Sequence, residues 1–192
     1  MKKLYFFLLV YGSASIQAAG QQLEFIRENV VFRLDSAHLT VTADLWLKNP
    51  HAQNVTQAFH IPFACEGSNY VTDSLNVLDC SSNTYLKTFR KNVAGAMVQV
   101  SIAGHEQKKI KVNYIQNHDR KRAGYILTKV KYWNKPLPDA QYTLIVENPS
   151  IRIDSTSIKA DNISNEAGKI KQTWHKYNFS PSKELCFYFH FE

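Results

Sequence analysis

A regular alternation of apolar and polar residues is the feature that most constrains how this chain can fold. The stretch HLTVTADLWL places Leu39, Val41, Ala43, Leu45 and Leu47 on one side and puts mainly polar residues between them. A period of two residues is typical of a half-buried β-strand, and the β-branched content agrees with this interpretation. The chain shows no sustained helical period. The pattern therefore predicts an all-β protein.

Further segments with strand patterns are separated by turn signals at intervals of about ten residues, which favours a β-sandwich. They are residues 30–34, 55–63, 74–78, 84–89, 97–102, 108–115, 125–130, 142–146 and 184–191. We expect a single immunoglobulin-like antiparallel β-sandwich of roughly ten strands. Its last strand, ELCFYFHFE, carries large apolar side chains on one face and should belong to the core.

The first residues have the layout of a secretory signal peptide. Lys2 and Lys3 precede a short apolar stretch, and small residues follow up to Ala19. The apolar stretch is too short to span a bilayer. We therefore expect a signal peptide over 1–19, one domain over 20–192, and a soluble bacterial protein that is periplasmic or secreted.

The chain has three cysteines, Cys65, Cys80 and Cys186. An oxidising compartment favours one disulfide, and we expect it to join Cys65 to Cys80 because this pair closes a short loop. Such a bond would contribute about 3 kcal/mol in the chain-entropy description. The alternative is that all three cysteines are reduced and buried.

Positive charge is concentrated in one segment. The chain carries a formal charge of +7, and +5 without the two lysines of the expected signal peptide. Residues 105–135 contain nine basic and two acidic residues, hence +7, which leaves −2 for the rest of the expected domain. The basic character of this protein is therefore local.

This basic segment is predicted to form a β-hairpin over residues 108–133, with its turn near Arg120. In that register Lys109 faces Lys131 and Lys111 faces Lys129, while apolar residues such as Ile110 and Val130 share the opposite face. The candidate binding residues for an anionic partner are Lys109, Lys111, Arg120, Lys121, Arg122, Lys129 and Lys131. The alternative is a solvated sheet face whose lysines prevent aggregation.

The order of several motifs resembles an uncharacterised bacterial family of exported β-sandwich domains of unknown function. The segments are VVFRLDSAHLTVTADLWLKNP, AFHIPF, IKVNYIQ, YILTKVKYWNKPLPDAQYTLIVENP and YNFSPSKELCFYFHF. The matching residues are Asn49, Phe59, Pro62, Phe63, Tyr125, Leu127, Trp133, Pro136, Asn178, Phe179 and Pro181. The resemblance implies a fold and no particular chemistry.

Motifs for catalysis, metals or cofactors are missing from the sequence. The seven histidines form no H-E-x-x-H pattern and no spacing typical of a zinc module, and there is no G-x-S-x-G elbow or glycine-rich phosphate loop. We therefore expect no cofactor and no metal. Trp46 interrupts the polar side of its strand, so it is either covered by other elements or exposed as a contact for a partner or glycan.

These observations lead to a non-enzymatic exported envelope protein that acts as a binding or assembly module. An envelope protein, an anionic lipid or a polysaccharide is the expected partner, and nucleic acid is not expected outside the cytoplasm. Two alternatives remain open. One is a hydrolase or other enzyme with a site assembled from distant residues, and the other is a purely structural subunit of an envelope complex.

Overall fold

The computed structural model describes residues 22–63, 74–92, 94–133, 135–166 and 168–192, which form fourteen strands and one short 3-10 helix. The elements are β1 (Glu24–Leu34), β2 (His38–Lys48), β3 (Val55–Pro62), β4 (Asn76–Asp79), β5 (Thr84–Tyr85), β6 (Thr88–Asn92), β7 (Gly95–Ile102), β8 (Gln107–Asn117), β9 (Arg122–Tyr125), η1 (Thr128–Trp133), β10 (Leu137–Val146), β11 (Ile151–Thr156), β12 (Asn162–Glu166), β13 (Lys169–Phe179) and β14 (Leu185–Phe191). Within the described part of the chain, no helix is long and apolar enough to cross a bilayer.

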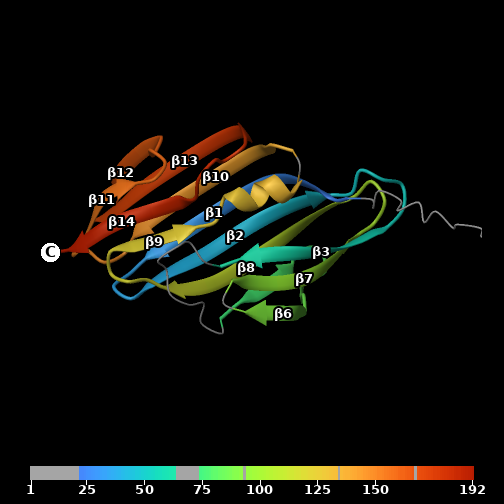
Figure 1. Ribbon diagram of the computed structural model, residues 1–192, viewed down its shortest axis with the longest axis horizontal. Coiled ribbons are helices and arrows are strands. Elements are labelled where there is room, and N and C mark those ends of the chain that lie inside the picture. Colours follow the sequence, from blue (N-terminus) through green and yellow to red (C-terminus); the bar gives the residue numbers. More distant parts are fainter. Residues whose placement is uncertain (1–21, 64–73, 93, 134, 167) are drawn as a thin grey trace, which may run out of the picture.

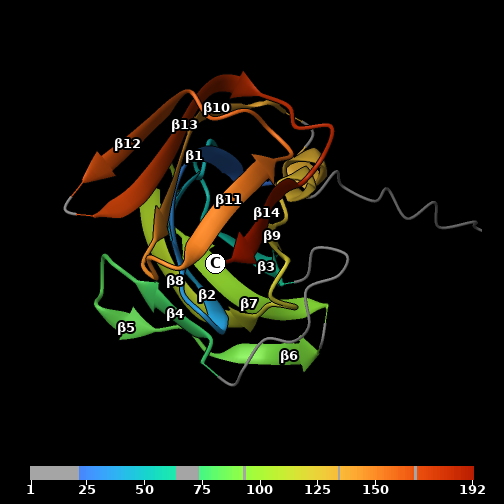
Figure 2. The same ribbon diagram turned by 90° about the vertical axis from the view of Figure 1, so that its left-hand side faces the viewer.

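The strands form one large sheet and two small ones (Figure 1). The large sheet has eight strands in the order β12-β13-β10-β1-β2-β8-β4-β5. The small sheets have the orders β11-β14-β9 and β3-β7-β6. Both small sheets lie on the same side of the large one, which gives a sandwich-like arrangement (Figure 2).

The core lies between the large sheet and the small sheets. In β2 the apolar residues of the alternating pattern, from Leu39 to Leu47, are buried, and the residues between them are half-buried. Phe32 of β1 packs edge-on against Phe187 of β14 at a centroid distance of 5.3 Å. The period-two pattern therefore predicted correctly which side of β2 faces the core.

An irregularity in β1 changes which side chains point inward. The register with β2 shifts between Phe25 and Arg27, so Phe25 and Glu28 are both buried although they are three residues apart. After the shift, Val30, Phe32 and Leu34 continue on the inner side. A bulge of this kind places the carboxylate of Glu28 inside the core.

The sequence correctly predicted an all-β protein. The structure has more strands than the roughly ten expected, because several of them are short. It is also not purely antiparallel, because β1 and β10 pair in parallel, with Arg27 opposite Asp139 and Leu34 opposite Val146. The immunoglobulin-like classification stays a prediction.

The C-terminal strand β14 belongs to the core, as expected. Leu185, Phe187 and Phe189 are at most 2% exposed, and Phe191 packs against the core from its edge. Just before this strand, the Glu184 carboxylate accepts hydrogen bonds from the backbone N–H of Leu127 at 2.5 Å and of Thr128 at 3.1 Å. Glu184 thereby caps the start of η1.

Candidate functional site

The predicted hairpin over residues 108–133 is wrong, although its turn is placed correctly. Asp119 Oδ1 accepts hydrogen bonds from the backbone of Lys121 and Arg122, and Arg120 takes a left-handed conformation with φ 66°. After this turn the two arms separate. β8 pairs with β2 and β4, β9 pairs with β14, and the second half of the predicted strand is η1.

The two strands separate because β8 has a longer apolar partner elsewhere. Its buried residues Ile110, Val112 and Tyr114 match the inner side of β2 over an eleven-residue register. In the segment after β9, Leu127 and Val130 lie three residues apart and are both buried, which suits a 3-10 turn. The pairs Lys109–Lys131 and Lys111–Lys129 therefore do not exist.

The seven candidate residues lie in four different places. Lys109 and Lys111 lie on the outer face of the large sheet, Arg120, Lys121 and Arg122 at the β8–β9 turn, Lys129 in the core and Lys131 on the exposed side of η1. They do not form one surface. Whether any of them binds an anionic partner stays a prediction.

Several of these cations already have partners within the protein. Lys109 Nζ lies 2.8 Å from Asp44 Oδ2, and Lys111 Nζ lies 4.0 Å from Asp44 Oδ1. The guanidinium of Arg120 covers the ring of Phe191 at 4.6 Å. The single carboxylate of Asp44 on β2 thus offsets part of the positive charge of Lys109 and Lys111, which lowers the value of β8 as an anion-binding surface.

Trp46 lies on the outer face of the large sheet and is half-buried. Its ring lies between two cations, with Arg27 at 4.9 Å and Lys109 at 5.0 Å from the ring centroid. Both cations come from the neighbouring strands at the same register. These two side chains cover the ring, so Trp46 is neither fully buried nor fully exposed, and neither alternative for it holds in full.

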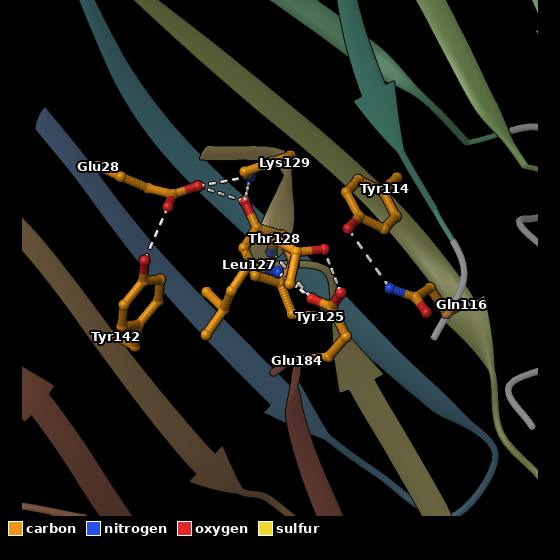
Figure 3. Close-up of polar contacts among 9 residues, drawn as sticks. All are labelled: Glu28, Tyr114, Gln116, Tyr125, Leu127, Thr128, Lys129, Tyr142 and Glu184. Carbon is orange, nitrogen blue, oxygen red and sulfur yellow. Dashed lines mark hydrogen bonds and ion pairs between the residues drawn. The ribbon is translucent and has the colours of Figure 1, made fainter. Parts of the chain in front are cut away.

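The most unusual group of polar residues is buried and surrounds Glu28 (Figure 3). The Glu28 side chain is fully buried, and Lys129 Nζ lies 2.6 Å from Oε1. Tyr125 donates to Oε1 at 2.5 Å and Tyr142 donates to Oε2 at 2.9 Å. Lys129 also donates to the Tyr125 hydroxyl. We call these four residues the Glu28 cluster.

Electrostatics of the Glu28 cluster keep both tyrosines as donors. Burial raises the pKa of Tyr125 and Tyr142 well above the usual value, and the adjacent Glu28 carboxylate raises both further. The cavity beside Lys129 and Tyr125 has a volume of about 10 Å³. That is space for about one water molecule and for no substrate. Lys129 also lines a second pocket, of about 130 Å³, whereas Glu28 and the two tyrosines do not line that pocket.

A second group of cations, which the sequence interpretation missed, lies at two sheet edges. Residues 84–92, TYLKTFRKN, include β5 at one edge of the large sheet and β6 at one edge of a small sheet. Both strands lie at the lower side of the molecule in Figure 2. Lys87, Arg90 and Lys91 are exposed, and the segment contains no Asp or Glu. We call residues 84–92 the basic edge segment.

Two aromatic side chains of the basic edge segment are also exposed. Tyr85 is 72% exposed and Phe89 is 59% exposed, and they are two of the five large apolar side chains exposed in the described part of the chain. They are four positions apart in the chain, so their Cα atoms are within about 14 Å. The signal in the sequence was three cations and two aromatic residues without an acid in nine positions.

The structure tests the cysteine, signal-peptide and metal expectations only in part. Cys65 and residues 1–19 lie outside the described residues, whereas Cys80 is a free thiol, so the Cys65–Cys80 disulfide is not confirmed. Cys186 is buried and its thiol accepts a hydrogen bond from Arg122 at 3.3 Å. Among the described side chains, no three His, Cys, Asp or Glu residues gather as metal ligands.

Neither a protein-family model nor a curated protein sequence matches the chain. Solved structures do resemble it. A Legionella pneumophila structure described as a "putative nutrient binding protein" aligns over 89% of this chain and 68% of its own, with a TM-score of 0.71 and 13% identity. An M1 zinc metallopeptidase from Deinococcus radiodurans aligns over 88% of this chain and 43% of its own, with a TM-score of 0.53 and 10% identity.

At these identities the likeness shows the fold alone. This chain spans less than half of the metallopeptidase. It has no H-E-x-x-H motif, because His105-Glu106 is followed by Lys109 where a second histidine would bind zinc. The family suggested by the sequence motifs stays a prediction.

Proposed function

We propose that this protein is a non-enzymatic exported module of the bacterial envelope that contacts an anionic lipid surface through the basic edge segment. The export and the envelope location rest on the signal-peptide pattern of residues 1–19. The sequence interpretation had assigned the contact with an anionic partner to residues 108–133. The basic edge segment replaces them in this proposal, because the predicted hairpin does not form.

A single observation carries this proposal, namely the exposure of Tyr85 and Phe89 in a nine-residue segment whose sequence contains three cations and no Asp or Glu. Aromatic side chains favour the boundary between lipid headgroups and acyl chains, and lysine and arginine are attracted by anionic headgroups. An acidic polysaccharide would use the cations but would have less use for two exposed aromatic rings. A lipid surface is therefore the better match.

The expected strength is modest. Each basic residue near an anionic membrane contributes about 1 kcal/mol, and this attraction decays within a Debye length of about 8 Å at physiological salt. Three cations and two partly inserted aromatic rings then support reversible and salt-sensitive binding. The fold likeness to a structure described as nutrient-binding supports a binding role in general, without naming a ligand.

Vesicle sedimentation tests the proposal. We expect the purified protein to sediment with vesicles that contain phosphatidylglycerol and to stay in solution with vesicles of phosphatidylcholine alone. Replacing Lys87, Arg90 and Lys91 with serine should abolish the binding, and replacing Tyr85 and Phe89 with serine should weaken it. Added salt should release the wild-type protein.

The matched control removes the same charge elsewhere, with Lys159, Lys169 and Lys183, all exposed, replaced by serine. This control should bind as well as the wild type. Equal binding by the Lys87/Arg90/Lys91 variant would disprove the contact surface. If the protein binds an acidic polysaccharide and the aromatic substitutions do not weaken that binding, the partner is a polysaccharide and not a lipid. If the protein only co-purifies with an envelope protein, the structural-subunit alternative is favoured.

A further inference from the structure

An open cleft of about 600 Å³ lies beside the first residues of β1 and the connection from η1 to β10. This volume falls in the range of small-molecule sites, which is about 300–1,000 Å³. Its walls include Phe25, Trp133 and the three prolines Pro50, Pro136 and Pro138. The basic edge segment contributes no residue to it, so this cleft is separate from the proposed membrane contact.

Trp133 is the rigid apolar element of this cleft. Its ring lies 5.5 Å from that of Phe25 and 5.8 Å from that of Phe59, in tilted contacts. The Trp133 side chain is nevertheless only partly buried, since it also borders the cleft. Two aromatic neighbours hold the indole in place, so a ligand meets a preformed apolar wall.

Two opposite charges also line the cleft. Lys135 Nζ donates to Glu24 Oε1 at 2.5 Å, and the Lys135 side chain is 70% exposed. The hydrogen bond from Lys135 lowers the pKa of Glu24, so Glu24 is ionised at neutral pH. An exposed pair of this kind contributes little to stability, so a ligand can separate its two members at small cost.

From this arrangement we infer that the cleft binds a free α-amino acid with a large apolar side chain. The α-ammonium group pairs with Glu24, the α-carboxylate pairs with Lys135, and the side chain packs against Trp133 and the prolines. The ammonium and carboxylate of an α-amino acid are attached to the same carbon, which matches two protein charges that lie side by side. A ligand with a single charge leaves one member of the pair without a partner.

Isothermal titration calorimetry with L-phenylalanine and L-leucine tests this inference. The matched analogues of phenylalanine are 3-phenylpropionate, which lacks the ammonium group, and 2-phenylethylamine, which lacks the carboxylate. We expect each analogue to bind at least about tenfold more weakly, since each loses one charge-assisted hydrogen bond. The dipeptide Leu-Leu should also bind more weakly, because its terminal charges are farther apart.

Glu24→Gln and Lys135→Met should each weaken phenylalanine binding by about tenfold, again through one charge-assisted hydrogen bond. The matched control is Glu166→Gln with Lys171→Met, which removes another exposed ion pair, on β12 and β13. This control should bind phenylalanine like the wild type. A circular dichroism spectrum of each variant confirms that it is folded.

Three results would overturn the inference: no heat of binding for any amino acid, equal affinity for phenylalanine and both analogues, or unchanged affinity in the Glu24 and Lys135 variants. None of them bears on vesicle binding, which depends on other residues. Loss of phenylalanine binding in Trp133→Ala but not in Trp46→Ala would place the ligand in this cleft, whereas the reverse would move it to the outer face of the large sheet.

Discussion

Glu28 and Lys129 form an ion pair inside the core, where charge is expensive. Removing a carboxylate and an ammonium group from water costs several kcal/mol each, and the attraction between them offsets this only with good geometry and further hydrogen bonds. Here Tyr125 and Tyr142 supply those hydrogen bonds to the carboxylate. The pair therefore depends on all four members of the Glu28 cluster.

Replacing only one member of the Glu28–Lys129 pair should lower the free energy of unfolding more than replacing both. Lys129→Met leaves the Glu28 carboxylate buried without its counterion, and we expect the free energy of unfolding to fall by about 3–5 kcal/mol. Glu28→Gln combined with Lys129→Met should lose less than Lys129→Met alone, because no buried charge remains. Urea unfolding followed by tryptophan fluorescence measures both.

Lys131→Met is the control for this comparison, because Lys131 lies on the same 3-10 helix and is exposed. Its effect should stay within about 0.5 kcal/mol, as for most surface substitutions. If the double variant proved less stable than Lys129→Met, the Glu28 carboxylate would stabilise the core through its hydrogen bonds with Tyr125 and Tyr142 even without its counterion.

At the level of elements, β4, the turn after it and β8 are connected by one carboxylate. Asp79 at the end of β4 lies 2.7 Å from Lys108 Nζ of β8 and accepts hydrogen bonds from the backbone and hydroxyl of Ser81. Burial disfavours its ionised form, but the hydrogen bonds from Lys108 and Ser81 outweigh burial and lower the pKa of Asp79 to about 2. This carboxylate therefore stabilises the fold when it is ionised.

The pH dependence follows from the direction of this shift. Because the pKa of Asp79 is lower in the folded protein, its contribution is present above its ordinary pKa of 3.8 and is lost as the pH falls towards about 2. Asp79→Asn should reduce the free energy of unfolding by about 2 kcal/mol at pH 7, and by progressively less below pH 4. Denaturant unfolding at several pH values measures this difference.

Asp154→Asn is the matched control, because the Asp154 carboxylate is about half exposed and pairs with His190 at the surface. Its substitution should change the stability little at any pH in this range. The free energies of unfolding of wild type and Asp79→Asn should approach each other on acidification. If their difference stayed constant, the Asp79 side chain would stabilise the fold by packing and not by charge.

At the level of the whole molecule, the last strand, β14, packs against the first strand, β1. It pairs with β9 and β11, and Phe187 contacts Phe32 of the first strand. Burying Phe187 and Phe189 contributes roughly 1.5–3 kcal/mol each. Loss of the strand also removes buried Leu185 and the pairing with β9 and β11, so the total loss is comparable with the net stability of a natural domain, about 5–15 kcal/mol.

Deletion of residues 185–192 should therefore abolish cooperative thermal unfolding and leave the inner face of the large sheet open. Removal of Glu192 alone, which is exposed, should preserve the transition. Differential scanning calorimetry and near-ultraviolet circular dichroism distinguish the two outcomes. A truncated chain that still unfolds cooperatively would mean that the large sheet is stable without β14.

Much of the fold could be predicted from local patterns. Alternation identified β2 and β14 and their core-facing sides, and the turn between β8 and β9 was correctly expected near Arg120. The alternating pattern did not identify the partner of each strand, because every half-buried strand offers the same kind of apolar side. The pairing of β8 with β2, and of β1 in parallel with β10, depends on which faces fit together in three dimensions.

The candidate sites were less predictable for the same reason. The alternating pattern placed Lys129 on the polar face of an expected strand. It is nevertheless buried, and its ammonium group pairs with Glu28, which is far away in the sequence. The basic edge segment could be found by its composition, but its exposure depends on β5 and β6 lying at sheet edges.

The sequence by itself determined the all-β class and the core-facing side of its clearest strands, because side-chain periodicity acts over a few residues. Only the tertiary structure decided the strand partners, the burial of the Glu28–Lys129 pair and the separation of the seven basic candidates. These features depend on packing between segments that are far apart in the chain, and no local pattern records that packing.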